Sequence, residues 1–277
     1  MDNRPDRRLS GALASPLSLL ALALAVAAAA PARAQEDMSR YYQATALVTG
    51  TDMRMRPTGF ADCLRRVLVK LSGEPRLAKD PRVAELAAHA DKLIDSFYYI
   101  DPTLRPVHDD QGTYDRTYYL TVGFEPALLD RALAALGERP WRGKRPVVIP
   151  ALAVHGVNRS YLLSSDEPAA ADQGVAFANV ASDYGVKVRL PSKSEFDGWG
   201  VTMNWFPSPQ ISSTPDQVIV VGTLAFDPQL PGWVGSWRML WQREAYVWGI
   251  KGVNYDAAFR DLVGGVLRLV SGHSAPE

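Results

Sequence analysis

The sequence is poor in cysteine, with Cys63 the single one among 277 residues. One cysteine cannot form an intrachain disulfide, so the hydrophobic core must hold the fold without covalent cross-links. A free cysteine among apolar residues behaves as a small core side chain, whereas reactive thiols need an accessible, electropositive setting. We therefore expect Cys63 to be buried and unreactive.

Net charge is also absent, because 30 Lys and Arg residues balance 30 Asp and Glu residues. Binding to nucleic acid or to an anionic membrane surface requires an excess of basic side chains that can neutralise phosphates. The charge balance therefore predicts neither nucleic acid nor a membrane surface as the partner.

The common catalytic signatures are missing as well. The chain has no G-x-S-x-G, S-x-x-K, H-E-x-x-H, C-x-x-C, phosphate-loop or G-x-G-x-x-G motif. None of the four histidines has metal-ligand spacing, and His273 falls in a tail that we expect to fray; the histidines are His89, His108, His155 and His273. We predict no catalytic residues, no cofactor and no metal, although residues distant in sequence can still assemble a triad in space.

A long apolar run is lacking too. Residues 19–30 form an apolar run of 12 residues, short of the about 20 that cross a bilayer as a helix. Basic residues precede the run, and Ala32-Arg33-Ala34 after it matches the small-x-small pattern of signal peptidase sites. We expect residues 1–34 to be a signal peptide cleaved after Ala34, which would send the mature chain to the periplasm without a transmembrane segment.

What the sequence does contain is clear helical periodicity. Apolar residues from Phe60 to Leu71 follow the i, i+3, i+4, i+7 stripe of an amphipathic helix, and charged residues, Arg66 among them, occupy the other face. Thr58 is the expected N-cap and Gly73 the expected left-handed stop. Further helices are expected over 80–94, 126–137, 172–184 and 254–270, and strands over 41–49, 96–100, 117–124, 146–154, 186–190, 218–226 and 233–248.

The order of these elements predicts an α+β fold with two small domains. Each would be a mostly antiparallel sheet with helices packed on one face. Residues 137–145 contain glycine, proline and four cations, a composition typical of a linker. We place the first domain at residues 35–140 and the second at 141–277.

The long connection over residues 192–214 is the predicted partner-binding site. Loops longer than about 12–15 residues tend to be functional or disordered, and disordered segments are usually poor in aromatic residues. This one contains Trp199, Asn204, Trp205 and Phe206. Aromatic side chains held on loops favour recognition, but the two tryptophans could equally fold back over a sheet edge.

Several short stretches resemble a bacterial envelope family, the domain of unknown function 2066. They are Arg66-Val-Leu-Val-Lys-Leu-Ser-Gly73, Trp141 with Arg145-Pro-Val-Val-Ile-Pro150, and Ala181-Ser-Asp-Tyr184. That family has no established activity and implies no catalytic residues. The order of elements in the second half is also loosely similar to the amino-terminal domain of TolB, which acts through protein–protein contacts, although fold alone does not fix function.

Three hypotheses for function follow. The first is a periplasmic adaptor or accessory protein without chemistry of its own, which binds another envelope protein. The second is a module that binds glycan or peptidoglycan through Trp199, Asn204 and Trp205. The third is an enzyme of unrecognised type.

Overall fold

The computed structural model describes residues 38–102, 116–203, 211–230 and 232–276. The predicted signal peptide lies outside these residues, and so do Asn204, Trp205 and Phe206. Residues Tyr41–Glu277 form one compact unit. Within the described residues, no helix combines the length and the apolar character that crossing a membrane requires.

The first part of the chain builds a three-stranded antiparallel sheet in the order β1-β3-β2. The strands are β1 (Gln43–Thr49), β2 (Ile94–Ile100) and β3 (Thr117–Phe124). Helix α3 (Arg56–Ser72) packs on one face of this sheet, since Cys63 Sγ lies 3.8 Å from the carbonyl oxygen of Leu120 in β3. The other helical segments here are η1 (Arg40–Tyr42), η2 (Pro75–Lys79), α4 (Pro81–Ala87), η3 (Ala90–Leu93) and α5 (Pro126–Ala135).

Helix α3 confirms the predicted apolar stripe. Cys63, Leu64 and Leu68 are all fully buried. Gly73 ends the helix with a φ of 78°, and its N–H bonds to the carbonyl oxygen of Val69. The predicted N-cap is wrong, because the cap is Met55 and Thr58 lies inside the helix.

Two further predictions in this region need correction. Arg66 is not a free solvent-facing residue: its Nη1 donates to Asp183 Oδ1 at 2.8 Å, and 31% of its side chain is exposed. The helix expected over 80–94 ends at Ala87, and Asp80 caps its start by accepting from Arg82 N. The chain then continues through η3 into β2, where Ile94 pairs with Phe124.

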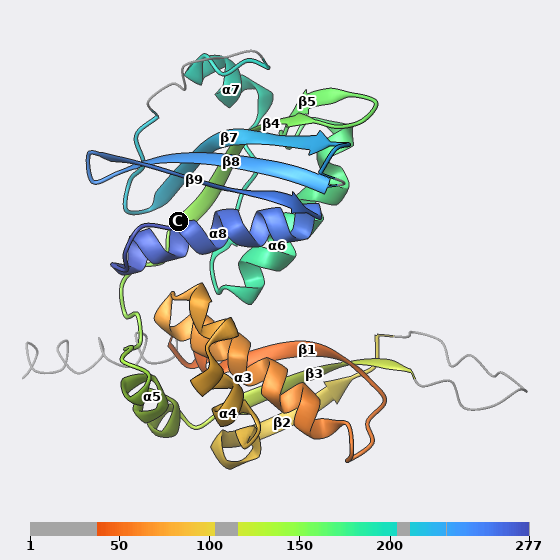
Figure 1. The fold of residues 1–277 in the computed structure, drawn as a ribbon, viewed down its shortest axis with the longest axis vertical. Coiled ribbons are helices and arrows are strands. Elements are labelled where there is room, and N and C mark those ends of the chain that lie inside the picture. The colour runs from red at the N-terminus through yellow and green to blue at the C-terminus, as the bar shows by residue number, and fades with distance from the viewer. Residues whose placement is uncertain (1–37, 103–115, 204–210, 231, 277) are drawn as a thin grey trace, which may run out of the picture. The chain divides into compact units, whose positions relative to one another are not determined.

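The second sheet has six strands in the order β5-β4-β7-β8-β9, with β6 beside β4. The pairs β4–β7 and β4–β6 are parallel and the remaining pairs are antiparallel. Helices α6 (Ala171–Asp183) and α8 (Tyr255–Ser271) lie along one side of this sheet and α7 (Lys193–Trp199) on the other (Figure 1). The strands are β4 (Val147–His155), β5 (Ser160–Leu162), β6 (Lys187–Val188), β7 (Gln217–Asp227), β8 (Gly232–Trp241) and β9 (Glu244–Val253), and η4 covers Pro168–Ala170.

Strand β4 is buried on both faces because helices lie on both sides of it. Val148 and Leu152 join the large core that contains α6 and α8. Ile149 and Ala151 point the opposite way, into a smaller core with Phe196 of α7. The apolar run of residues 146–154 therefore reflects two-sided burial, as expected for a strand of this composition.

The segment predicted as one strand over 233–248 is a hairpin. Strands β8 and β9 are joined by Gln242 and Arg243, whose φ angles are 51° and 72°. Positive φ at both positions is the mark of a type I′ turn, which usually carries Asn-Gly. Gln242 and Arg243 are not this pair, so the sequence did not show the turn and predicted one continuous strand. Trp237 and Met239 of β8 are buried on the same face of the sheet.

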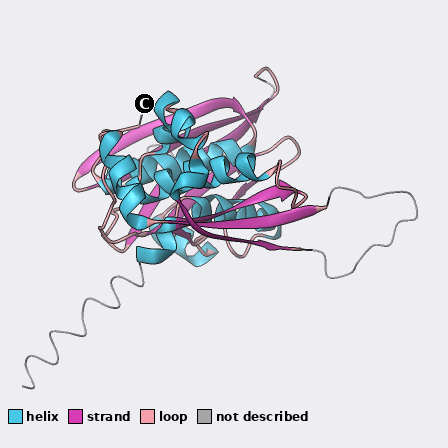
Figure 2. Ribbon diagram, turned by 90° about the horizontal axis from the view of Figure 1, so that it is seen from below, coloured by secondary structure: helices cyan, strands magenta, loops and turns pink. Residues whose placement is uncertain are grey.

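The described residues contain both helices and strands (Figure 2), and most strand pairs are antiparallel. The predicted α+β class with mostly antiparallel sheets is thus confirmed. Helix α7 adds a second covered face to the larger sheet. The domain boundary between residues 140 and 141 stays a prediction.

Candidate functional site

The face of the first sheet opposite α3 carries exposed apolar side chains. Leu120 and Val122 of β3 are buried on the α3 side, so their neighbours in the strand point the other way. On that opposite face, Leu47, Tyr119 and Ile100 form a row across the three strands. Their exposed fractions are 62%, 44% and 51%. We call this surface the open face.

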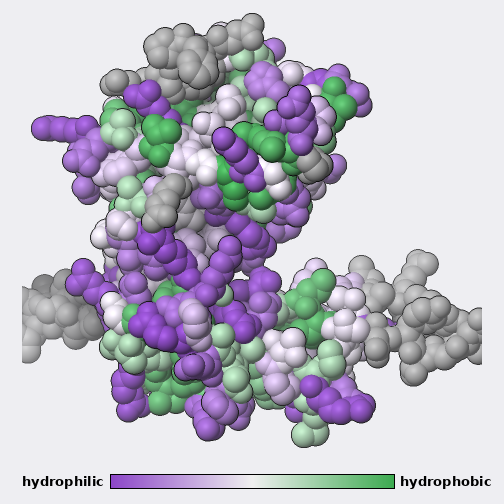
Figure 3. Space-filling view, viewed as in Figure 1, coloured by the Kyte–Doolittle hydropathy of each residue, from purple (hydrophilic) through white to green (hydrophobic). Residues whose placement is uncertain are grey.

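The open face is uncharged. It consists of alternate residues from the three paired strands, and none of them is acidic or basic; they are Gln43, Thr45, Leu47, Thr49, Ser96, Tyr98, Ile100, Thr117, Tyr119, Thr121 and Gly123. Charged residues make up 22% of the whole chain. In the view of Figure 3, apolar residues occur as separate patches between hydrophilic ones. Such scattered exposure is ordinary, whereas a contiguous apolar surface marks interaction sites.

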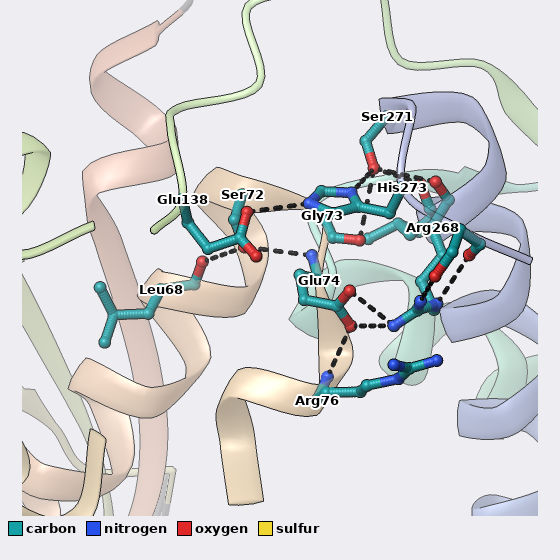
Figure 4. Close-up of polar contacts among 11 residues, drawn as sticks. Leu68, Ser72, Gly73, Glu74, Arg76, Glu138, Arg268, Ser271 and His273 are labelled. Carbon is teal, nitrogen blue, oxygen red and sulfur yellow. Dashed lines mark hydrogen bonds and ion pairs between the residues drawn. The ribbon is translucent and has the colours of Figure 1, made fainter. Parts of the chain in front are cut away.

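A second feature is the buried ion pair between Glu74 and Arg268 (Figure 4). Glu74 follows α3 and Arg268 lies in α8, with side-chain exposures of 9% and 5%. Arg268 Nη1 donates to both carboxylate oxygens of Glu74, each at 2.5 Å. Its Nε and Nη2 donate to the backbone and hydroxyl oxygens of Ser274.

Beside this pair, Glu138, His273 and Ser271 form a hydrogen-bonded chain. His273 Nε2 lies 2.9 Å from Glu138 Oε2, and its Nδ1 lies 2.7 Å from Ser271 Oγ. His273 is therefore held in place, and the expectation of a frayed tail is wrong. Its position depends on Ser271 and on Glu138, and Glu138 is 135 positions away in sequence, so the local pattern did not predict this contact.

The three hydrogen-bonded residues have the composition of a serine–histidine–acid triad, but their surroundings do not suit nucleophilic attack. A triad needs an accessible hydroxyl and free N–H donors for the developing oxyanion. Ser271 Oγ is bonded to the carbonyl oxygen of Leu267 at 2.7 Å and packs against Gly73. The nearby N–H groups of Gly73 and Glu74 are already bonded to Val69 O and Ser72 Oγ.

The same residues resemble a metal site. Ligand atoms of Glu74, Glu138 and His273 lie within 4.8 Å of one another. However, both oxygens of Glu74 already bind Arg268. The guanidinium supplies the positive charge that a metal ion would bring, and it would repel a second cation. The arrangement therefore fits a structural ion pair that ties α3 to α8.

Of the predicted partner-binding residues, the structure describes Trp199. It lies on α7, so the connection expected over 192–214 begins with a helix. Ser192 and Glu195 form a capping box at the start of that helix, and this S-x-x-E pattern was the overlooked sequence signal. The ring of Trp199 lies 6.1 Å from that of Phe196 and packs beside the smaller core. Asn204, Trp205 and Phe206 lie outside the described residues.

Comparison with known proteins finds one match to a family model. A family described as a domain of unknown function (DUF8605) matches residues 35–142, which include β1, β2, β3 and α3. The match supports the expected domain of unknown function, but the matched family is not the family 2066 named above, and the match does not support the similarity to TolB. No curated protein and no solved structure matches the chain.

Proposed function

We propose that this protein is a non-catalytic periplasmic adaptor that binds another envelope protein through its open face. The observation that carries the proposal is the uncharged row of Leu47, Tyr119 and Ile100, with Tyr98 beside it at 54% exposure. Aromatic and aliphatic side chains without charge are typical of the centre of protein interfaces. The proposal also draws on the resemblance of several short stretches to the envelope family 2066 and on the loose similarity of the second half to the TolB amino-terminal domain.

The dimensions of the open face favour an amphipathic helix as the occupant. Three strands of about seven residues span about 14 Å by 23 Å, or roughly 300 Å². A helix of about 10–12 Å diameter fits across the three strands. Helix α3 covers the other face of the same sheet in this way.

Site-specific photocross-linking in the periplasm tests the proposal. A photoreactive phenylalanine analogue at Tyr98 or Tyr119 should cross-link to one defined envelope protein, within an amphipathic helix. Val175 is the matched control site, because it is an exposed apolar residue (63%) on α6. Adding Leu47→Asp should abolish the cross-link from Tyr119 without lowering Tm. Equal cross-linking from Val175, or none from the open face, would refute the proposal.

The periplasmic location is itself part of the proposal and rests on residues 1–34. Intact mass measurement of protein from the periplasmic fraction should show a chain that begins at Gln35. Periplasmic protein that retains residues 1–34 would contradict cleavage after Ala34.

A further inference from the structure

A hollow of about 320 Å³ lies on the second sheet, away from the open face. Its walls come from the β4–β5 turn, the start of α6, the start of β8 and the start of α8. Its lining includes Trp233, Tyr255, Asn158, Arg159, Asp172 and Gln173. Ligand sites commonly combine apolar walls with a few polar groups in such a volume.

Two aromatic rings in the lining are held in place by neighbours. The Trp233 ring packs edge-on against Phe226 at 5.7 Å. The Tyr255 ring lies 5.9 Å from that of Phe259, and 36% of Tyr255 is exposed. These rings offer a ligand apolar contact area that costs little conformational entropy, because their positions are already fixed.

The hollow also contains a buried amide with bonding capacity to spare. Gln173 is 7% exposed, and its Oε1 accepts from the hydroxyl of Tyr161 at 2.8 Å. The amide has two further N–H donors on Nε2, for which no acceptor is found among the described residues. Gln173 lines the hollow, so an amide with unused donors borders the space that a ligand would occupy.

The charges in the lining cancel. Arg159 supplies one cation, stacked 5.5 Å from the Tyr161 ring centre, and Asp172 supplies one anion. With the amides of Asn158 and Gln173, the lining presents both donors and acceptors without net charge. A matching ligand is neutral, rich in hydroxyl groups, and apolar on one face. A sugar ring has this combination.

We propose that this hollow binds one saccharide unit of a glycan. The ring's apolar face would lie against Trp233 and Tyr255, and its hydroxyl groups would bond to Asp172, Asn158 and Gln173. The hollow opens to solvent, which suits one unit of a longer chain better than an enclosed small molecule. The site is independent of the adaptor function, because it shares no residue with the open face.

Titration calorimetry of the full mature protein with chitotriose and with maltotriose tests this proposal. One of the two should bind saturably. Tyr255→Ala and the isosteric Asp172→Asn should each weaken that binding about tenfold or more, a loss of about 1.4 kcal/mol. Tyr98→Ala is the matched control, since it removes an exposed tyrosine outside the hollow and should leave the affinity unchanged.

Any of three results would overturn the proposal. The first is that neither trisaccharide binds saturably up to about 10 mM, and the second is that both hollow variants bind as well as the parent protein. The third is that adenosine, a neutral ligand with a flat ring, binds in the hollow while the trisaccharides do not. If Tyr255→Ala disturbs the start of α8, the affinity of the Asp172→Asn variant still tests binding in the hollow. Loss of cross-linking at the open face would leave these results unaffected.

Discussion

Single side chains on the buried face of α3 set much of the stability of the first sheet. Leu68 of α3 is fully buried, and protein interiors are packed so closely that truncating a side chain leaves a cavity. Cys63 lies on the same buried face. Burial, reinforced by the charge of Asp62, raises the pKa of the Cys63 thiol to about 12.

Leu68→Ala should lower the free energy of unfolding by about 2–5 kcal/mol, the usual cost for a buried leucine. Urea denaturation of the mature protein measures this loss. Glu85→Ala on the exposed side of α4 is the control and should change stability by less than about 0.5 kcal/mol. Arg66→Ala is not a suitable control, because it removes the ion pair with Asp183. Equal losses for Leu68→Ala and Glu85→Ala would show that the assigned helix face is wrong.

Cys63 should resist thiol reagents in the native protein. The thiolate is the reactive form, and a pKa of about 12 leaves almost none of it at neutral pH. The side chain is also inaccessible. Ellman's reagent should therefore react at the rate of global unfolding, and rapidly once urea is added. Fast reaction without denaturant would disprove the burial.

At the scale of elements, the capping box of α7 is a pH-sensitive contact. Glu195 accepts hydrogen bonds from Arg189 and from the N–H of Ser192. These bonds lower its pKa from 4.5 to about 2, with the Arg189 bond as the larger cause. A carboxyl with a depressed folded-state pKa stabilises the protein above its unfolded-state pKa. That contribution is lost as pH falls from 4.5 towards 2.

Glu195→Gln should therefore lower stability near neutral pH, by less than about 1 kcal/mol because the pair is solvent-exposed. The difference from the parent protein should shrink as the pH approaches about 3. Urea midpoints measured at several pH values provide the test. Glu85→Gln, on exposed α4, is the control for a general effect of losing a carboxylate. A difference that grows in acid would contradict the lowered pKa of Glu195 in the folded protein.

At the scale of the whole molecule, the Glu74–Arg268 pair joins segments that are 194 residues apart. Removing one member leaves the other charged, buried and unpaired, which typically costs about 3–5 kcal/mol. Arg268→Ala should lose this much in urea denaturation. Arg142→Ala, in an exposed pair with Asp130, should lose less than about 1 kcal/mol.

Two further measurements separate an ion pair from a metal site. The Glu74→Ala, Arg268→Ala double variant should cost less than the sum of the single variants, because the two side chains interact. A chelator should leave the Tm of the parent protein unchanged. A chelator-induced fall in Tm would instead indicate a metal bound by Glu74, Glu138 and His273.

The sequence determined the elements with strong periodicity. The apolar stripe of α3 and its stop at Gly73 follow from local spacing, and the structure confirms both. Where signals were weak or unusual, prediction failed. The Gln242-Arg243 turn lacks the usual residues, and the capping box before α7 sits among turn formers that hid it.

Only the tertiary structure decided which surfaces stay uncovered and which distant polar groups meet. Strand β1 has apolar residues on both faces, so its sequence does not show that Leu47 is exposed while Ala46 is buried. Glu138 and His273 meet, as do Glu74 and Arg268, because chain folding brings together helix ends far apart in sequence. Local patterns report each residue's neighbours along the chain, and these contacts depend on packing between separate elements.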